Sequence, residues 1–324
     1  MTELIIGHNK SVEPFLSQLK RGRFPHAWLF EGPKGVGKAT LARLLAATVL
    51  GDSYSADNNG FKLTSSEAYK KIEASNHPDV RIVSDEREEG DTRSSQISVD
   101  EIRKLTGFFE LQASQGGYRV GIVDSLDNLN ANGANALLKT LEEPPEKCLL
   151  ILIYHGSTSI LPTIRSRCVR LKFSALPRDD LQAAIRAFET EAPASEDVLA
   201  LSGGSPGRLR TYLDCDADIL ISELKTSIFN SWPEVSSSRW PKLKRLMSIS
   251  ELHLELGVAA ISHWLGQMAR SETASLENSR YARLWSELNA SAERGKALKL
   301  DKSERAAAHL QMLIRLSDEM RVRA

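Results

Sequence analysis

The chain has 324 residues, and 41% of them are apolar, which is enough for two or three domains with cores of their own. Lys and Arg together number 42, and Asp and Glu together also number 42, so the formal net charge is zero. Zero net charge excludes the whole-protein basic footprint of a dedicated nucleic-acid binder, although it allows a local basic patch.

The first half of the chain alternates apolar strand patterns with helical patterns up to residue 173. A capping box formed by Ser98 and Glu101 opens one helix, and Pro144-Pro145 ends another. Such alternation predicts an open parallel sheet with helices on both faces. The polar segment 51–76 is predicted to be poorly ordered. Strands are predicted at 27–31, 80–83, 118–124, 149–154 and 169–173, and helices at 38–50, 98–111 and 132–142.

Strand patterns stop after residue 173, and the rest of the chain has helical periodicity. Three short helices are predicted first, and from about residue 219 the pattern is helical throughout. This change of pattern predicts that an α/β domain is followed by an all-α region. The helical segments are predicted at 178–190, 195–202 and 207–213, and then near 240–250, 252–270 and 303–320.

The segment from residue 32 to 39, GPKGVGKA, nearly matches the phosphate-binding loop G-x-x-x-x-G-K-[ST]. Glycines let backbone N–H groups surround phosphate oxygens, the lysine reaches the outer phosphates, and the final hydroxyl ligates Mg²⁺. Ala39 occupies the hydroxyl position, and Thr40 is turned by about 100° around the helix axis, so neither is expected to hold the metal. The candidate phosphate-binding residues are Gly32, Gly35, Gly37 and Lys38.

The predicted strand 118–124 ends in Asp124, where a P-loop NTPase places the acid that organises the metal. The next residue is Ser125, which cannot polarise water as a carboxylate does, and the spacing of Asp127 points it elsewhere. A second hydrolysis element is therefore missing. Tyr154 and His155 end the next strand, and they are interpreted either as sensors of the γ-phosphate or as structural caps of the core.

Two arginines are further candidates for chemistry. Arg167 precedes the last predicted strand of the first domain, and Arg208 follows the glycine-rich segment GGSPG at 203–207. Taken individually, each could equally be a solvated surface residue or a salt-bridge partner.

The three cysteines, Cys148, Cys168 and Cys215, are scattered and include no C-x-x-C pair. This pattern favours reduced thiols in a cytoplasmic protein over a disulfide framework, and it argues against a structural zinc site. No apolar run has the length of a signal peptide or a membrane span, so no membrane association is expected.

An ordered series of motifs resembles the clamp-loader branch of the AAA+ ATPases. The motifs extend from residue 25 to residue 168, and the helical C-terminal third agrees in type. Because both hydrolysis elements are degraded, the chain looks like a non-motor subunit of that branch. The matching segments are PHA at 25–27, HPD at 77–79, ISVDEIR at 97–103, NALLKTLEEPP at 135–145 and TIRSRC at 163–168.

The resemblance implies an AAA+ ATPase-like domain at 1–173, a small helical lid at 174–217 and a helical collar at 218–324. It further implies a hetero-pentameric ring with the motor subunit (gamma/tau) and the delta subunit, which meets the sliding clamp and primer-template DNA as a complex. Arg167 would be an arginine finger for the neighbouring ATP site, and Arg208 a lid-borne sensor with an uncertain role. The cysteine-free segment 51–76 replaces a zinc module of many relatives, so no zinc is expected.

Three functional hypotheses follow. The leading one is a non-hydrolysing subunit that completes the ring and donates Arg167, requires no cofactor and binds ATP or ADP weakly if at all. The second is an active ATPase motor in which Thr40 or water replaces the missing metal ligand. The third is a nucleotide-binding switch without turnover, which the intact cradle and Lys38 would allow.

Overall fold

The computed structural model describes residues 4–22, 24–57, 60–85, 96–114, 117–187, 194–234, 237–270 and 275–321. The chain forms two compact units. The first comprises Met1–Thr190 with Gly204–Gly207, and the second comprises Glu191–Gly203 with Arg208–Ala324. The three domains predicted from the sequence stay a prediction, because a division into two units does not test their boundaries.

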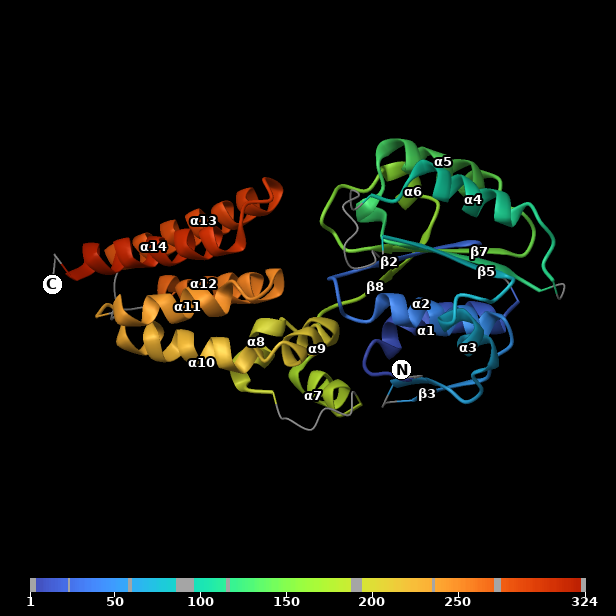
Figure 1. Ribbon diagram of the computed structural model, residues 1–324. Helices are drawn as coiled ribbons and strands as arrows, with labels where there is room; N and C mark the ends of the chain where they lie inside the picture. Colours follow the sequence, from blue (N-terminus) through green and yellow to red (C-terminus); the bar gives the residue numbers. More distant parts are fainter. Residues whose placement is uncertain are drawn as a thin grey trace. The chain divides into compact units, whose positions relative to one another are not determined.

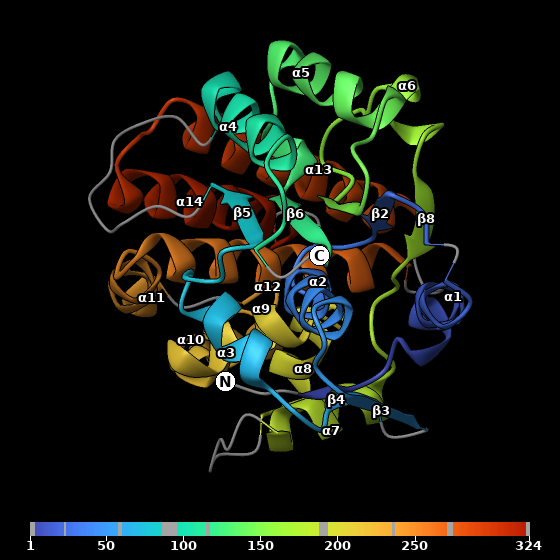
Figure 2. The ribbon, with the colours of Figure 1, turned by 90° about the vertical axis from the view of Figure 1, so that its right-hand side faces the viewer.

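The first unit is built on a five-stranded sheet in which every neighbouring pair of strands is parallel (Figures 1 and 2). The strand order is β5-β6-β7-β2-β8, so β2 lies inside the sheet with β7 and β8 on its two sides. The parallel sheet predicted from the sequence is confirmed, and the strand ends differ by at most one residue. The strands are β2 Ala27–Glu31, β5 Val80–Ser84, β6 Arg119–Asp124, β7 Cys148–Tyr154 and β8 Val169–Lys172.

Helices cover both faces of this sheet (Figure 1). On one face lie α1 (Asn9–Lys20), α2 (Lys38–Val49) and α3 (Glu67–Glu73), and on the other lie α4 (Val99–Phe109), α5 (Ala131–Glu142) and the short α6 (Pro162–Arg165). The predicted capping box of α4 is present. No element was predicted before residue 27, and Pro14 inside α1 disguises its helical pattern.

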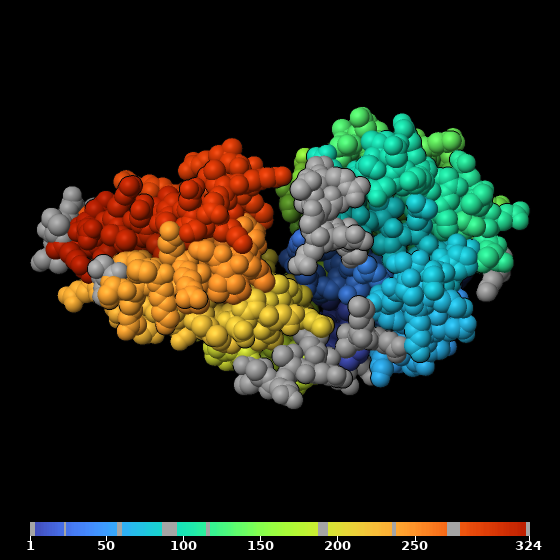
Figure 3. All heavy atoms as spheres, in the orientation of Figure 1, coloured from blue at the N-terminus to red at the C-terminus, as the bar shows by residue number. Residues whose placement is uncertain are grey.

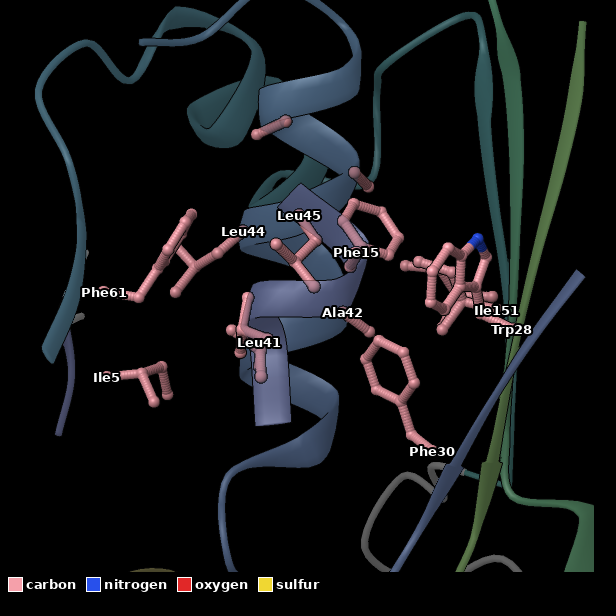
Figure 4. Close-up of a cluster of buried hydrophobic side chains, with 14 of the residues drawn as sticks. Ile5, Phe15, Trp28, Phe30, Leu41, Ala42, Leu44, Leu45, Phe61 and Ile151 are labelled. Atoms are coloured by element: carbon pink, nitrogen blue, oxygen red, sulfur yellow. The ribbon is translucent and has the colours of Figure 1, made fainter. Parts of the chain in front are cut away.

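Strand β2 shows how one apolar segment supplies two cores. Successive side chains of a strand point to opposite faces. Trp28 and Phe30 accordingly pack with Phe15 and the α2 side chains on one face (Figure 4), whereas Ala27 and Leu29 pack on the face covered by α4 and α5. All five residues of β2 are buried, which is expected of a central parallel strand.

The prediction that segment 51–76 is poorly ordered is wrong for its described residues. It forms β3 (Tyr54–Asp57), β4 (Gly60–Leu63) and α3, and β4 also pairs with β1 (Leu4–Ile5) in an antiparallel sheet of order β1-β4-β3. The buried Asp52 carboxylate accepts hydrogen bonds from the N–H groups of Ala68 (3.2 Å) and Tyr69 (2.9 Å) at the start of α3. Polar composition concealed this order because the contacts are non-local.

Asp52→Ala is expected to lower the free energy of unfolding by about 2 kcal/mol, because two N–H groups at the start of a helix lose a charged acceptor. Urea unfolding measures the loss, and amide hydrogen exchange at Ala68 and Tyr69 locates it. Asp52→Asn keeps one carbonyl acceptor and should lose less. Unchanged exchange at both amides in the alanine variant would remove Asp52 as the anchor of this segment.

The second unit is helical, and its helices form one continuous packed body in the space-filling view (Figure 3). The predicted helical segments are confirmed in type, and residues 188–190 of the predicted helix 178–190 lie outside the described residues. None of the described helices is long and apolar enough to cross a membrane. The remaining helices of the chain are η1 Leu126–Asn128, α7 Arg178–Ala187, α8 Glu196–Ser202, α9 Pro206–Asp214, α10 Ala217–Ser227, η2 Phe229–Ser231, η3 Ser237–Arg239, α11 Trp240–Met247, α12 Glu251–Arg270, α13 Ser275–Ala297 and α14 Lys302–Arg321.

Candidate functional site

The glycine-rich loop joins β2 to α2 at the carboxyl end of the central strand. Gly37 caps the N-terminus of α2 with a φ of 102°, a left-handed conformation that favours glycine. Gly32 packs against the residue that follows β8, since a Cβ atom added there would lie 2.2 Å from the Phe173 carbonyl oxygen. The strand–loop–helix context that the phosphate-loop prediction requires is present.

Each backbone carbonyl from residue 32 to residue 36 accepts a hydrogen bond from the first unit itself. The Lys38 amine donates to two of them, and three donors come from other segments of the chain. The loop is therefore held in shape by its own protein, and phosphate would have to compete for Lys38. The bonds run from Lys38 Nζ to Gly32 O (2.5 Å) and Pro33 O (2.6 Å), from Ser205 Oγ to Lys34 O (3.2 Å), from Gly207 N to Gly35 O (2.9 Å) and from His8 Nε2 to Val36 O (3.0 Å).

Lys38 is buried, with 2% of its surface exposed. Burial lowers the pKa of its amine to about 8, and the negative charges of Asp124 and Asp127 oppose that shift. The structure thus brings Lys38, Asp124 and the loop glycines to one edge of the sheet, as the sequence predicted.

The spacing of Asp127 predicted that its side chain points away from the site. The structure corrects this, because the carboxylate contacts the loop that follows β7 at the same edge of the sheet. Its carboxylate accepts the N–H groups of His155 (2.6 Å) and Ser157 (2.7 Å) and so shapes the loop after β7. Burial works against ionisation of Asp127, but these two hydrogen bonds, together with smaller contributions from His155 and from the backbone at residue 127, lower the pKa. Asp127 is thereby engaged in backbone contacts.

His155 lies beside the metal-organising position, with its Nε2 atom 3.7 Å from Asp124 Oδ1. Burial, followed by the charge of Lys38, lowers the pKa of His155 to about 4, so the ring is neutral at physiological pH and the contact with Asp124 is not an ion pair. Tyr154 donates its hydroxyl to the Thr158 carbonyl oxygen, which supports the structural alternative for that residue. A sensor role for either residue stays a prediction.

The pKa of His155 makes the free energy of unfolding depend on pH. The unfolded chain binds a proton near the ordinary value of 6.5 and the folded chain only near 4, so stability is lost as the pH falls through this window. Between pH 7 and pH 4, His155→Gln is expected to lose about 2 kcal/mol less than the unchanged protein. Urea unfolding at both pH values measures the difference. Equal losses would contradict the lowered pKa.

The two positions that the hydrolysis prediction singled out carry no suitable ligand. Ala39 packs against the core cluster beside α2, and Ser125 is buried with 2% of its surface exposed. Among the described residues no group of three or more His, Cys, Asp or Glu side chains is placed to hold a metal ion. The chemistry that these side chains offer is phosphate contact through Lys38 and the loop, without a second carboxylate for water.

Arg167 directly follows Ser166, the C-cap of α6. Its Nη1 atom donates to the Thr163 carbonyl oxygen (2.9 Å), and its Nη2 atom forms an ion pair with Glu142 Oε1 (2.8 Å). Arg165 pairs in a similar way with Glu31 at the end of β2 (3.1 Å). Arg208 belongs to the second unit, and its nucleotide role stays a prediction.

Sequence analysis missed His8, Ser205 and Glu142 as partners of the predicted site residues. His8 is 28 positions from Val36, and Ser205 is 171 positions from Lys34. Glu142 was noticed only as part of a motif. No local pattern reports contacts of this kind, because they depend on how distant segments meet in the fold.

A family model that covers about half of the chain identifies its family. The sequence profile described as "DNA polymerase III, delta subunit" matches residues 7–177. The chain is 39% identical over 191 residues to DNA polymerase III subunit delta' of Pseudomonas aeruginosa, across 57% of this chain and 55% of that protein. It is 33% identical over 216 residues to the gamma/tau subunit of Mycobacterium tuberculosis, across 65% of this chain and 36% of that protein.

The alignments do not extend over whole proteins, since the chain spans about half or less of the length of these curated relatives. The fold has a broader match. A DNA polymerase III gamma-subunit-related protein of Thermotoga maritima superposes with a TM-score of 0.51 at 15% identity, covering 94% of this chain and 99% of that one. At that identity the similarity concerns the fold alone.

Proposed function

Because the chain belongs to the DNA polymerase III delta-subunit family of clamp-loader proteins, we propose that it is a non-hydrolysing subunit of a clamp loader in DNA replication. In this role it completes a ring with gamma/tau-type and delta-type subunits in the cytoplasm. Through that complex it meets the sliding clamp and primer-template DNA. The ring partners are inferred from the relatives of this chain, which are delta' and gamma/tau subunits.

The observation that carries the proposal is the state of the phosphate loop. Lys38 donates to the carbonyl oxygens of Gly32 and Pro33 within its own loop, and the next residue, Ala39, offers no oxygen to Mg²⁺. The residue after Asp124 is a serine, which cannot orient water as a carboxylate does. These features support a structural role for the loop and argue against ATP hydrolysis at this site.

A second observation that supports the proposal is a partly exposed arginine whose described contacts do not involve the phosphate loop. Arg167 has 35% of its side chain exposed, and its partners are Thr163 and Glu142. An arginine supplied in trans stabilises the charge that develops on a transferring phosphoryl group. We therefore assign Arg167 as a finger for the ATP site of the neighbouring subunit.

A second candidate function is nucleotide binding without turnover. The glycines of the loop and Lys38 are in place, and Asp124 lies near the amine. In this case ATP or ADP would displace Lys38 from the two loop carbonyl oxygens. The active-motor alternative requires Thr40 or water to replace the missing metal ligand as well as a substitute for the carboxylate at residue 125.

Steady-state ATP hydrolysis by the isolated chain, with Mg²⁺ and saturating ATP, tests the proposal. We expect no turnover above that of a Lys38→Ala variant. Turnover that depends on Lys38 would overturn the non-hydrolysing role and favour the motor. Equilibrium titration with a fluorescent ATP analogue then separates the two other functions, because saturable binding that depends on Lys38 identifies the nucleotide-binding switch.

A further inference from the structure

The guanidinium of Arg167 is held at two points. Its Nη1 atom donates to the carbonyl oxygen of Thr163, one turn earlier, and its Nη2 atom pairs with Glu142 Oε1 at 2.8 Å. The first contact ties one terminal nitrogen of the guanidinium to the backbone of α6 (Pro162–Arg165). The second ties the other terminal nitrogen to Glu142, and two contacts at two different nitrogens restrict rotation of the planar group.

Glu142 is itself well anchored although its side chain is about half exposed. It is the last residue of α5, and Pro144-Pro145 prevent the helix from continuing. The preceding residue, Leu141, is buried in the core, and its carbonyl oxygen accepts a hydrogen bond from His26 Nε2 (3.2 Å) just before β2. The residue before the central strand thus anchors the backbone next to Glu142.

From this geometry we propose that Glu142 is a positioning residue for Arg167, which holds the guanidinium extended from the protein toward a phosphate of the neighbouring subunit. The inference rests on the finger role proposed above. A guanidinium has five N–H donors, and the two contacts described here occupy two of them. Donors are therefore left for a bidentate phosphate contact while Glu142 stays bound.

Positioning has a kinetic consequence because a long side chain left free samples many rotamers. Arginine has large side-chain entropy to lose, and a displacement of a catalytic group by about 1 Å can cost about 10²-fold in rate. The exposed ion pair contributes little to stability, so its removal should leave folding intact. Glu142→Ala should consequently lower the rate of hydrolysis and leave the affinity for ATP unchanged.

The test uses the clamp loader assembled with the gamma/tau-type and delta-type subunits of the same organism. Glu142→Ala is expected to lower kcat for ATP hydrolysis at the site that receives Arg167 by about threefold to tenfold, with KM unchanged. Glu142→Gln keeps a carbonyl acceptor at the same place and should restore most of the rate. The matched control is Glu143→Ala, which removes the same charge from an exposed neighbour that has no ion-pair partner among the described residues.

Each outcome decides between named alternatives. If Glu142→Ala behaves as Glu143→Ala while Arg167→Ala abolishes the rate, the positioning role fails and the finger role survives. If Arg167→Ala has no effect either, the finger role proposed above fails, and the positioning role fails with it. A faster rate in Glu142→Ala would overturn positioning and identify the carboxylate as a brake that holds Arg167 back. A rise in KM at constant kcat, or failure of Glu142→Gln to restore the rate, also counts against positioning.

Discussion

Arg167→Ala is expected to slow ATP hydrolysis at the neighbouring subunit's site by about 10³-fold or more, which is the range known for arginines supplied in trans. The reason is electrostatic, because a positive group aimed at the transferring phosphoryl stabilises charge that develops only in the transition state. Binding of ATP to the neighbour should change little. A rapid-quench experiment on the assembled complex measures ATP hydrolysis in the first turnover. The amplitude of its fast phase should fall by the contribution of the one site that receives Arg167.

Arg170→Ala is the control for this substitution. Arg170 is exposed on β8, three positions further along the chain, so this substitution removes the same charge from an exposed position close in sequence. The fast phase of ATP hydrolysis by the complex that carries Arg170→Ala should match that of the unchanged complex. If Arg167→Ala also retains the full fast phase, Arg167 is not the finger of that site and its pair with Glu142 is only a surface contact.

Gly32→Ala is expected to lower the free energy of unfolding of the first unit by roughly 3 kcal/mol, since backbone strain and overpacking act together there. The new Cβ atom would lie 2.2 Å from the Phe173 carbonyl oxygen. The backbone cannot move aside easily, because Gly32 N–H donates to Tyr154 O (3.2 Å) and Phe173 N–H donates to Glu31 O (2.7 Å). Urea unfolding followed by circular dichroism measures the loss.

Gly107→Ala provides the comparison for Gly32→Ala. Gly107 lies inside α4, and a Cβ atom added there meets no atom within 4 Å. This substitution should be neutral or stabilise the protein by up to about 1 kcal/mol, because alanine favours a helix more than glycine does. If both variants unfold alike, close packing does not explain the glycine at residue 32. A loss confined to Gly32→Ala would show that the loop is needed by the fold even without a nucleotide.

The comparison of Gly32→Ala with Gly107→Ala tests whether the phosphate-loop glycine is needed by the fold. A motif match reports residue types at a set spacing, and here it correctly predicted the strand, the loop and the helix N-terminus. It does not report where the lysine amine lies. Lys38 is turned onto the carbonyl oxygens of its own loop, and this is visible only in three dimensions.

For segment 51–76, in contrast to the phosphate loop, the prediction from the sequence was wrong. Its polar, turn-rich composition predicted poor order, yet the described residues form two strands and a helix. Its order depends on the pairing of β4 with β1 and on the carboxylate of Asp52, which caps α3 from 16 and 17 positions away. Composition describes what a segment can do alone, whereas this segment is stabilised by contacts from elsewhere.

The sequence by itself determined the parallel α/β architecture, the helical C-terminal part and the departures from the motif at Ala39 and Ser125, because each depends on local periodicity or on the identity of one side chain. Tertiary structure alone decided that His8 and Ser205 bind the loop and that Glu142 holds Arg167. These contacts join segments far apart in the chain, and their geometry is set by how the strands and helices pack. Packing is a property of the whole first unit, so no window of the sequence contains it.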